Sequence, residues 1–172
     1  MWIVAGVIGG LVLLKFFTSN GKPMGELTIP DEDDVEALGR MIASENPRDP
    51  RIIQVAIAWT ARNEAARLHK SVASLVMPGG VPGPQVGRYA STVNAATDAT
   101  RGVAFDVLSG KEPDPTGGAI QFDAPKTQDI LYAQGKVRLS ATGVAAARKA
   151  EGKVPVYLAG VDPNYMRWWR YA

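Results

Sequence analysis

The sequence contains no cysteine and only one histidine among its 172 residues. Without cysteine, a disulfide scaffold, a thiol nucleophile and a thiolate metal site are all excluded. The single histidine, His69, excludes a histidine-rich metal cluster, and we expect it to be a surface residue. We therefore expect neither a metal nor another cofactor.

An excess of charge of one sign is also missing. Nineteen Lys and Arg residues stand against 17 Asp and Glu residues, which leaves a formal net charge of +2. A balance this even gives no electrostatic argument for a nucleic-acid partner, and we expect none. The length favours one soluble domain that can bury a core, and the 18 Gly and 12 Pro residues indicate substantial loops without general disorder.

Charged residues are almost absent from residues 1–17, where Lys15 is the only one. A helix of this length spans roughly 25 Å, close to the thickness of a bilayer core. No basic residue precedes the apolar run and no small-x-small site follows it, so we expect a retained membrane anchor. A cleaved signal peptide or a buried core helix are the alternatives. Gly6 and Gly10 have the small-xxx-small spacing that allows anchor helices to self-associate.

Beyond the anchor, we expect a polar linker over residues 18–29 and one domain over residues 30–172. Apolar spacing and capping residues predict helices over 30–45, 50–67, 91–108, 127–134 and 140–151, with an irregular loop over 77–87. Asp49 is expected to cap the second helix, with Pro50 at its first position. Short extended segments are expected over 119–122 and 154–158. The predicted fold class is mainly α (α+β), with a small β region.

Two stretches of the sequence resemble one known family. The first stretch is Glu45-Asn46-Pro47-Arg48-Asp49-Pro50, followed by Gln54-Val55-Ala56-Ile57-Ala58 and by Asn63. The second stretch is Asp114-Pro115-Thr116-Gly117-Gly118-Ala119, followed by Phe122 and Pro125. In this order, about 70 residues apart, they resemble the signature of SleB-type cell-wall hydrolases, the spore-cortex-lytic enzyme family. Asp49 stands in place of the second Glu of the family pattern.

This resemblance implies a lysozyme-like helical domain that cleaves peptidoglycan glycan strands, commonly as a lytic transglycosylase. With the expected anchor, the catalytic domain would face the cell wall from the membrane, or the protein would be part of a virion if a phage encodes it. A muramidase that adds water, and a membrane-anchored module that binds glycan without cutting it, are the alternatives.

Glu45 is the candidate catalytic residue. Cleavage of a glycosidic bond requires an acid that protonates the departing oxygen. Glu45 ends a predicted helix, where the helix dipole disfavours a negative charge, and it precedes an apolar helix that disfavours it further. Both effects favour a carboxyl group that keeps its proton. A solvated glutamate at a helix end is the alternative.

A two-carboxylate mechanism would need a partner for Glu45, and its spacing singles out none of the candidates Asp49, Asp106, Asp114 and Asp123. A transglycosylase needs no second carboxylate, because the 6-hydroxyl of muramic acid attacks the anomeric carbon and the same glutamate accepts its proton.

The remaining candidates would contact the saccharide. Thr116, Gly117 and Gly118 are expected in a turn that lets the backbone approach a sugar, and an ordinary turn is the alternative. Gln54 or Asn63 would line the cleft, with a buried amide as the alternative. The resemblance adds Gln121 and Phe122, which stand in the second stretch. Tryptophan and tyrosine residues near the end of the sequence are expected in the core or at a membrane interface rather than on sugar rings: Trp168, Trp169 and Tyr171.

Overall fold

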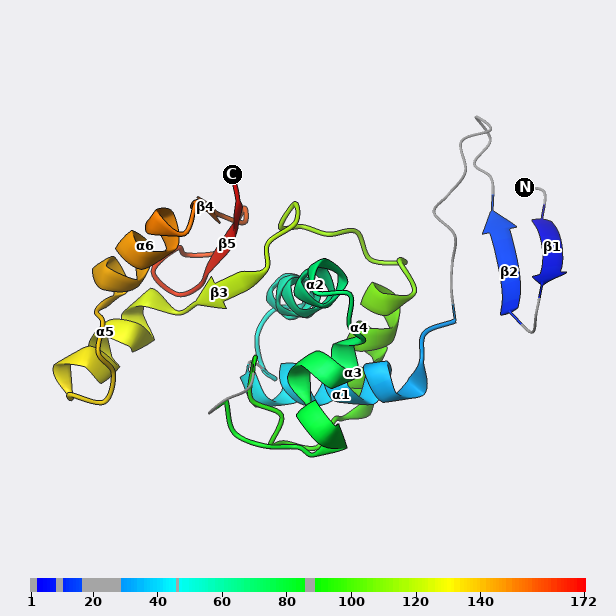
Figure 1. Cartoon of the computed structure of the whole chain (residues 1–172), viewed down its shortest axis with the longest axis horizontal. Coiled ribbons are helices and arrows are strands. Elements are labelled where there is room, and N and C mark those ends of the chain that lie inside the picture. The colour runs from blue at the N-terminus through cyan, green and yellow to red at the C-terminus, as the bar shows by residue number, and fades with distance from the viewer. Residues whose placement is uncertain (1–2, 9–10, 17–28, 46, 86–88) are drawn as a thin grey trace. The chain divides into compact units, whose positions relative to one another are not determined.

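The computed structural model describes residues 3–8, 11–16, 29–45, 47–85 and 89–172 as helices, short strands and loops (Figure 1). The chain divides into two compact units, residues 1–48 with 71–113 and residues 49–70 with 114–172. The described residues combine helices with a small antiparallel sheet, which confirms the α+β class.

The N-terminal prediction is wrong in its secondary structure. Ile3–Ile8 (β1) and Leu11–Phe16 (β2) pair as antiparallel strands, with Ile3 opposite Phe16. Isoleucine and valine make up four of the six residues of β1, and β-branched residues favour strands over helices, whereas β2 is half leucine and pairs with β1. Across the described ranges, no helix is both long and apolar enough to cross a membrane. Residues 18–28 of the predicted linker, and Gly10 of the predicted self-association motif, lie outside the described residues.

The first unit is built around α1 (Glu32–Glu45), which confirms the first predicted helix. Its first turn carries three acidic residues that complement the helix dipole, and most of its apolar side is buried. The helix contacts both α4 (Asp98–Leu108) and α3 (Val72–Val76), which leads into the short helix η1 (Pro78–Gly80). Gly39 allows α1 to lie close to α4 and to the segment before it. A Cβ atom at Gly39 would lie 3.0 Å from the Cβ of Ala96 and 3.5 Å from the Cα of Arg101.

Helix α4 is shorter than predicted, because it begins at Asp98 rather than near Ser91. Thr97 accepts a hydrogen bond from the backbone N–H of Thr100, and the Thr100 hydroxyl accepts one from the backbone N–H of Thr97. This reciprocal capping box fixes the helix start. Residues 91–96 are consequently left outside the helix, where their backbone groups can bond to other segments.

The second unit contains α2 (Arg51–Arg67), whose apolar residues are buried around much of its circumference, as predicted. The predicted cap is wrong: Pro50 occupies the capping position without a side-chain hydrogen bond. The Asp49 carboxylate instead accepts a hydrogen bond from the Tyr165 hydroxyl, at 2.6 Å from Oδ1. A bond to a residue distant in sequence thus replaces the local cap.

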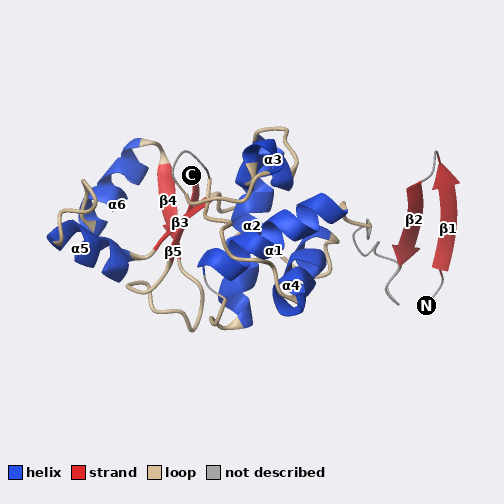
Figure 2. Cartoon of the chain, turned by 90° about the horizontal axis from the view of Figure 1, so that it is seen from below, coloured by secondary structure: helices blue, strands red, loops and turns tan. Residues whose placement is uncertain are grey.

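A three-stranded antiparallel sheet completes the second unit (Figure 2). Its strands, in spatial order, are β3 (Gln121–Asp123), β5 (Arg167–Tyr171) and β4 (Lys153–Val156). The helices α5 (Pro125–Ala133) and α6 (Ala141–Ala150) contact each other, and α6 contacts β4. Trp168 and Trp169 of β5 are buried, which confirms the core alternative for both tryptophans, whereas Tyr171 is exposed.

Candidate functional site

Glu45 is the last residue of α1, and its side chain is half-buried. Its Oε1 accepts a hydrogen bond of 2.9 Å from the backbone N–H of Ser91. Its Oε2 has no hydrogen-bond partner among the described residues. One carboxyl oxygen is therefore held by the Ser91 N–H, and the other has no partner in the described part of the chain.

Residues 91–94, which we call the strap, run beside the C-terminal end of α1. The backbone N–H of Asn94 donates to the Ser44 hydroxyl, and the Asn94 side-chain amide donates to the Ala43 carbonyl, both at 2.9 Å. Each of the last three residues of α1 is thus bonded to the strap. The hydrogen bond from the Asn94 side chain also satisfies the Ala43 carbonyl, one of the carbonyl groups that a helix leaves unpaired at its end.

The surroundings of Glu45 favour its protonated form. Burial raises the pKa of Glu45, and the hydrogen bond from Ser91 opposes this effect without cancelling it. Among the described residues, no charged side chain contributes to this shift of the Glu45 pKa. The prediction that burial would favour a protonated Glu45 therefore agrees with the geometry, and a raised pKa is what a general acid requires.

The second motif forms a turn around the carboxylate of Asp114. Its Oδ1 accepts hydrogen bonds from the backbone N–H and the hydroxyl of Thr116, and its Oδ2 accepts bonds from the Gly118 N–H and the Asn63 amide. Burial pushes the pKa of Asp114 upward, but these four hydrogen bonds outweigh it and lower the pKa. Asp114 is therefore a stably ionised residue that organises the turn.

Thr116 lies inside this turn and is only 1% exposed. Its hydroxyl donates to Asp114 and accepts from the N–H of Ala119, so both functions are used within the protein. Gly117 and Gly118 are exposed and have φ angles of 59° and 95°, which favour glycine. The turn thus presents the backbone of its two glycines, rather than the threonine hydroxyl, to solvent.

The other predicted saccharide contacts also lie in the second unit, whereas Glu45 lies in the first. Asn63 bonds to Asp114 and to the Ala119 carbonyl, and the Gln54 amide donates to the Asp49 carbonyl. The Gln121 side chain accepts a hydrogen bond from Lys153, and Phe122 is half-buried in β3. The structure brings Asn63, Thr116 and Gly118 together around Asp114.

The four candidates for a second carboxylate all have structural partners. Asp49 accepts from Tyr165, and Asp106 pairs with Lys111 at 2.9 Å. Asp123 pairs with Arg167 at 2.6 Å and also accepts from the indole of Trp169. Asp114 has the four donors described above. The predicted surface position of His69 is confirmed, since its side chain is exposed.

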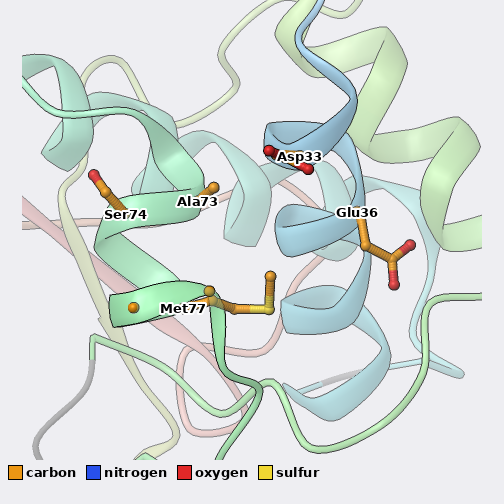
Figure 3. A pocket seen from close by; sticks show the side chains of 7 residues that line it. Asp33, Glu36, Ala73, Ser74 and Met77 are labelled. Carbon is orange, nitrogen blue, oxygen red and sulfur yellow. The ribbon is translucent and has the colours of Figure 1, made fainter.

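A separate cavity of about 330 Å³ lies in the first unit and is lined by residues of α1, α3 and η1. Figure 3 shows the side chains that line it. The Met77 side chain extends toward α1 in this view, and Asp33 faces α3 from the first turn of the helix. Asp33 precedes Glu45 by 12 residues, which corresponds to roughly 18 Å along a helix. The cavity is therefore distinct from the surroundings of Glu45.

Ser91 and Asn94 were not identified from the sequence, because neither belongs to a motif. The only local signal was Thr97, a capping residue that could have ended the predicted helix and left residues 91–96 in a loop. No family model matches this sequence, and comparisons with curated proteins and with solved structures found no similar protein.

Proposed function

We propose that this protein is a lysozyme-like lytic transglycosylase that cleaves peptidoglycan glycan strands, with Glu45 as its general acid and base. One observation carries the proposal. Glu45 is a half-buried carboxyl with a raised pKa, one oxygen bound to the Ser91 N–H and the other without a partner in the described part of the chain. The SleB-like motifs, which begin at Glu45, supply the substrate class.

In the proposed reaction, protonated Glu45 donates its proton to the glycosidic oxygen while the bond from that oxygen to the anomeric carbon breaks. The 6-hydroxyl of the same muramic acid then attacks the anomeric carbon, and its proton passes to the Glu45 carboxylate. The products are a shortened strand and a 1,6-anhydro-muramic acid end, and no water is consumed. The nucleophile is already tethered near the reacting carbon, which gives it a high effective concentration.

The state of the other acids supports a mechanism with one carboxyl group. Asp49, Asp106, Asp114 and Asp123 each accept a hydrogen bond from a named side chain or backbone group. Asp114 and Asp123 use both carboxylate oxygens in hydrogen bonds within the fold, so recruiting either as a second catalytic carboxylate would first break such bonds. Reuse of Glu45 requires no such change.

The Asp114 turn supports a role in binding. Its four internal hydrogen bonds fix the turn, and Arg170 donates to the Gly117 carbonyl at 3.1 Å. Exposed glycine backbone held this firmly can approach a sugar closely, since no Cβ stands in the way. We propose that Gly117 and Gly118 contact the saccharide and that Thr116 and Asn63 maintain their conformation.

We further propose that residues 1–17 attach the protein to a membrane, with the rest of the chain directed toward the cell wall. The support is the apolar composition of this segment, in which Lys15 is the only charged residue. Deleting residues 1–20 should abolish flotation with lipid vesicles and preserve cleavage of isolated cell walls. Retained flotation would contradict the attachment.

The central test is mass spectrometry of the muropeptides that the full chain releases from isolated peptidoglycan. The wild-type protein should release products with 1,6-anhydro-muramic acid ends, lighter by one water than hydrolysis products. Glu45→Gln has nearly the same shape but no transferable proton, so release should fall by at least about 100-fold. Glu32→Gln, the same change at an exposed position of α1, is the matched control.

The products separate the alternatives. Reducing-end products that depend on Glu45 would identify a muramidase and overturn the transglycosylase. Binding to peptidoglycan without any release would indicate a non-catalytic module. Turnover of folded Glu45→Gln above about a tenth of the wild-type value would remove Glu45 from the mechanism, because general acid catalysis is worth about 10²–10⁴-fold.

A further inference from the structure

The strap is fixed on two sides. On one side, Asn94 bonds to Ala43 and Ser44, as described above. On the other side, Thr92 is fully buried, its N–H donates to the Gly83 carbonyl at 2.9 Å, and its hydroxyl accepts from the Gly83 N–H at 3.0 Å. Ser91, the donor to Glu45, lies beside Thr92, so its N–H is held by neighbours rather than by the bond to Glu45 alone.

Asn94 makes the strap's connection to the helix. Its side-chain amide and its backbone N–H bond to two consecutive residues of α1, immediately before Glu45. A glutamate side chain at the end of a helix has three rotatable bonds, and a single hydrogen bond at the correct place selects among its rotamers. The conformation of the Glu45 carboxyl group therefore depends on where the strap places the Ser91 N–H.

We propose that Asn94 is a positioning residue for Glu45: by clamping the strap to the end of α1, it holds the Ser91 N–H against Oε1 and leaves Oε2 facing the reacting bond. The catalytic consequence rests on the function proposed above, whereas the effect on the carboxyl group of Glu45 does not.

The test compares Asn94→Ala with the wild-type full chain by two readouts. Carboxyl ¹³C NMR follows the titration of Glu45 directly and needs no activity. The hydrogen bond from Ser91 lowers the pKa of Glu45. Because loss of the clamp weakens this bond, the titration midpoint of Glu45 should rise in the variant. The kcat for peptidoglycan cleavage should fall roughly tenfold with KM nearly unchanged, because a misplaced catalytic group costs rate.

Ser71→Ala is the matched control. Ser71 caps α3 in the same unit through a hydrogen bond to the Ser74 N–H, so its loss destabilises the unit without touching the strap. A merely structural Asn94 would behave like Ser71, with lower stability and an unchanged Glu45 titration, and that result would overturn the proposal. Ser44→Ala, which removes one acceptor of the clamp, should give a smaller rise of the midpoint and replaces Asn94→Ala if that variant does not fold.

The two readouts distinguish failure of the clamp from failure of the proposed function. A raised Glu45 midpoint in Asn94→Ala, together with a wild-type protein that cleaves nothing, would support the clamp and refute the proposed function. Active wild-type protein with the same Glu45 titration and the same kcat in Asn94→Ala would refute the clamp and leave the proposed function intact.

Discussion

The two motifs each contain a partly buried carboxyl group, Glu45 at the end of α1 and Asp114 at the start of a turn, and the protein treats them in opposite ways. Glu45 accepts one hydrogen bond, and burial raises its pKa. Burial also acts on Asp114, but its four hydrogen bonds outweigh this effect and lower its pKa. Burial alone therefore does not decide whether a carboxyl group stays protonated. In these two groups, the number of hydrogen-bond donors around the carboxyl group decides the direction of the pKa shift.

This difference separates a carboxyl group that keeps an unbonded oxygen, among the described residues, from one whose oxygens are all used within the fold. A carboxylate with all its lone pairs in use cannot take up a proton without losing stabilising bonds. A carboxyl with one oxygen unbonded exchanges its proton without disturbing the fold. The contrast between Glu45 and Asp114 can be tested by removing the carboxyl groups or the donors around them. The following variants do so in order of decreasing expected effect.

Asp114→Ala should cause the largest loss of stability. The change leaves the donors of Thr116, Gly118 and Asn63 without their acceptor, and an unsatisfied buried donor costs about 1–3 kcal/mol. Because Gly118 is exposed and can bond to water, we expect a total loss of roughly 2–4 kcal/mol in the free energy of unfolding, measured by urea denaturation.

Asp98→Ala, at a fully exposed aspartate, should change stability by only about 0.5 kcal/mol. The loss of unfolding free energy in Asp114→Asn should lie between those of Asp114→Ala and Asp98→Ala, since the asparagine amide keeps one acceptor oxygen. Folded Asp114→Asn should retain most of the cleavage activity. A normal unfolding free energy together with lost activity would instead make Asp114 catalytic.

Thr116→Val should have a smaller effect than Asp114→Ala. The valine keeps the shape of the side chain but loses the hydroxyl that donates to Asp114 and accepts from Ala119. We expect a loss of about 1–2 kcal/mol in unfolding free energy and a moderate rise in KM, because Thr116 holds the conformation of the glycine turn, while Thr116→Ser should keep the hydroxyl bonds. A large rise in KM with unchanged stability would show that the Thr116 hydroxyl binds the saccharide directly.

Most helices could be predicted from the sequence, because their signals are local. The apolar spacing of α1 and α2 and the Ser140 cap of α6 lie within the elements they define. The N-terminal segment could not be predicted, because its hydrophobicity indicates burial or a membrane, and only its first run, Ile3–Ile8, is rich in the β-branched residues that favour strands. Strand β5 was missed because its pairing partners, β3 and β4, are distant in sequence.

The candidate site was predictable in part. Glu45 stands out through its motif and its place at a helix end, and Gly117 and Gly118 through their turn pattern. The donors around Glu45 were not predictable, because Ser91 and Asn94 come from a strap that follows Glu45 by more than 40 residues. The internal use of the Thr116 hydroxyl was likewise hidden, since threonine in a turn has the same local signal whether it faces inward or outward.

The smallest expected effect is a difference in the pH dependence of stability between two conservative variants, Glu45→Gln and Asp114→Asn. The raised folded pKa of Glu45 means that its contribution to stability is complete below its unfolded pKa near 4.5 and is lost as pH rises through the folded value. Glu45→Gln cannot ionise, so it should become more stable relative to the wild type as pH rises from about 4 to about 8.

Asp114 should show the opposite dependence. Its folded pKa lies below 3.8, so its contribution is present above that value and is lost as pH falls through the folded pKa. The stability that Asp114→Asn loses relative to the wild type should therefore become smaller in acid. The stability that Glu45→Gln gains relative to the wild type should also become smaller there. Urea denaturation of both variants and the wild type, repeated from about pH 2 to about pH 8, measures both trends. If Glu45→Gln instead lost stability relative to the wild type as pH rises, Glu45 would be a stabilising carboxylate like Asp114, and the contrast between the two groups would be removed.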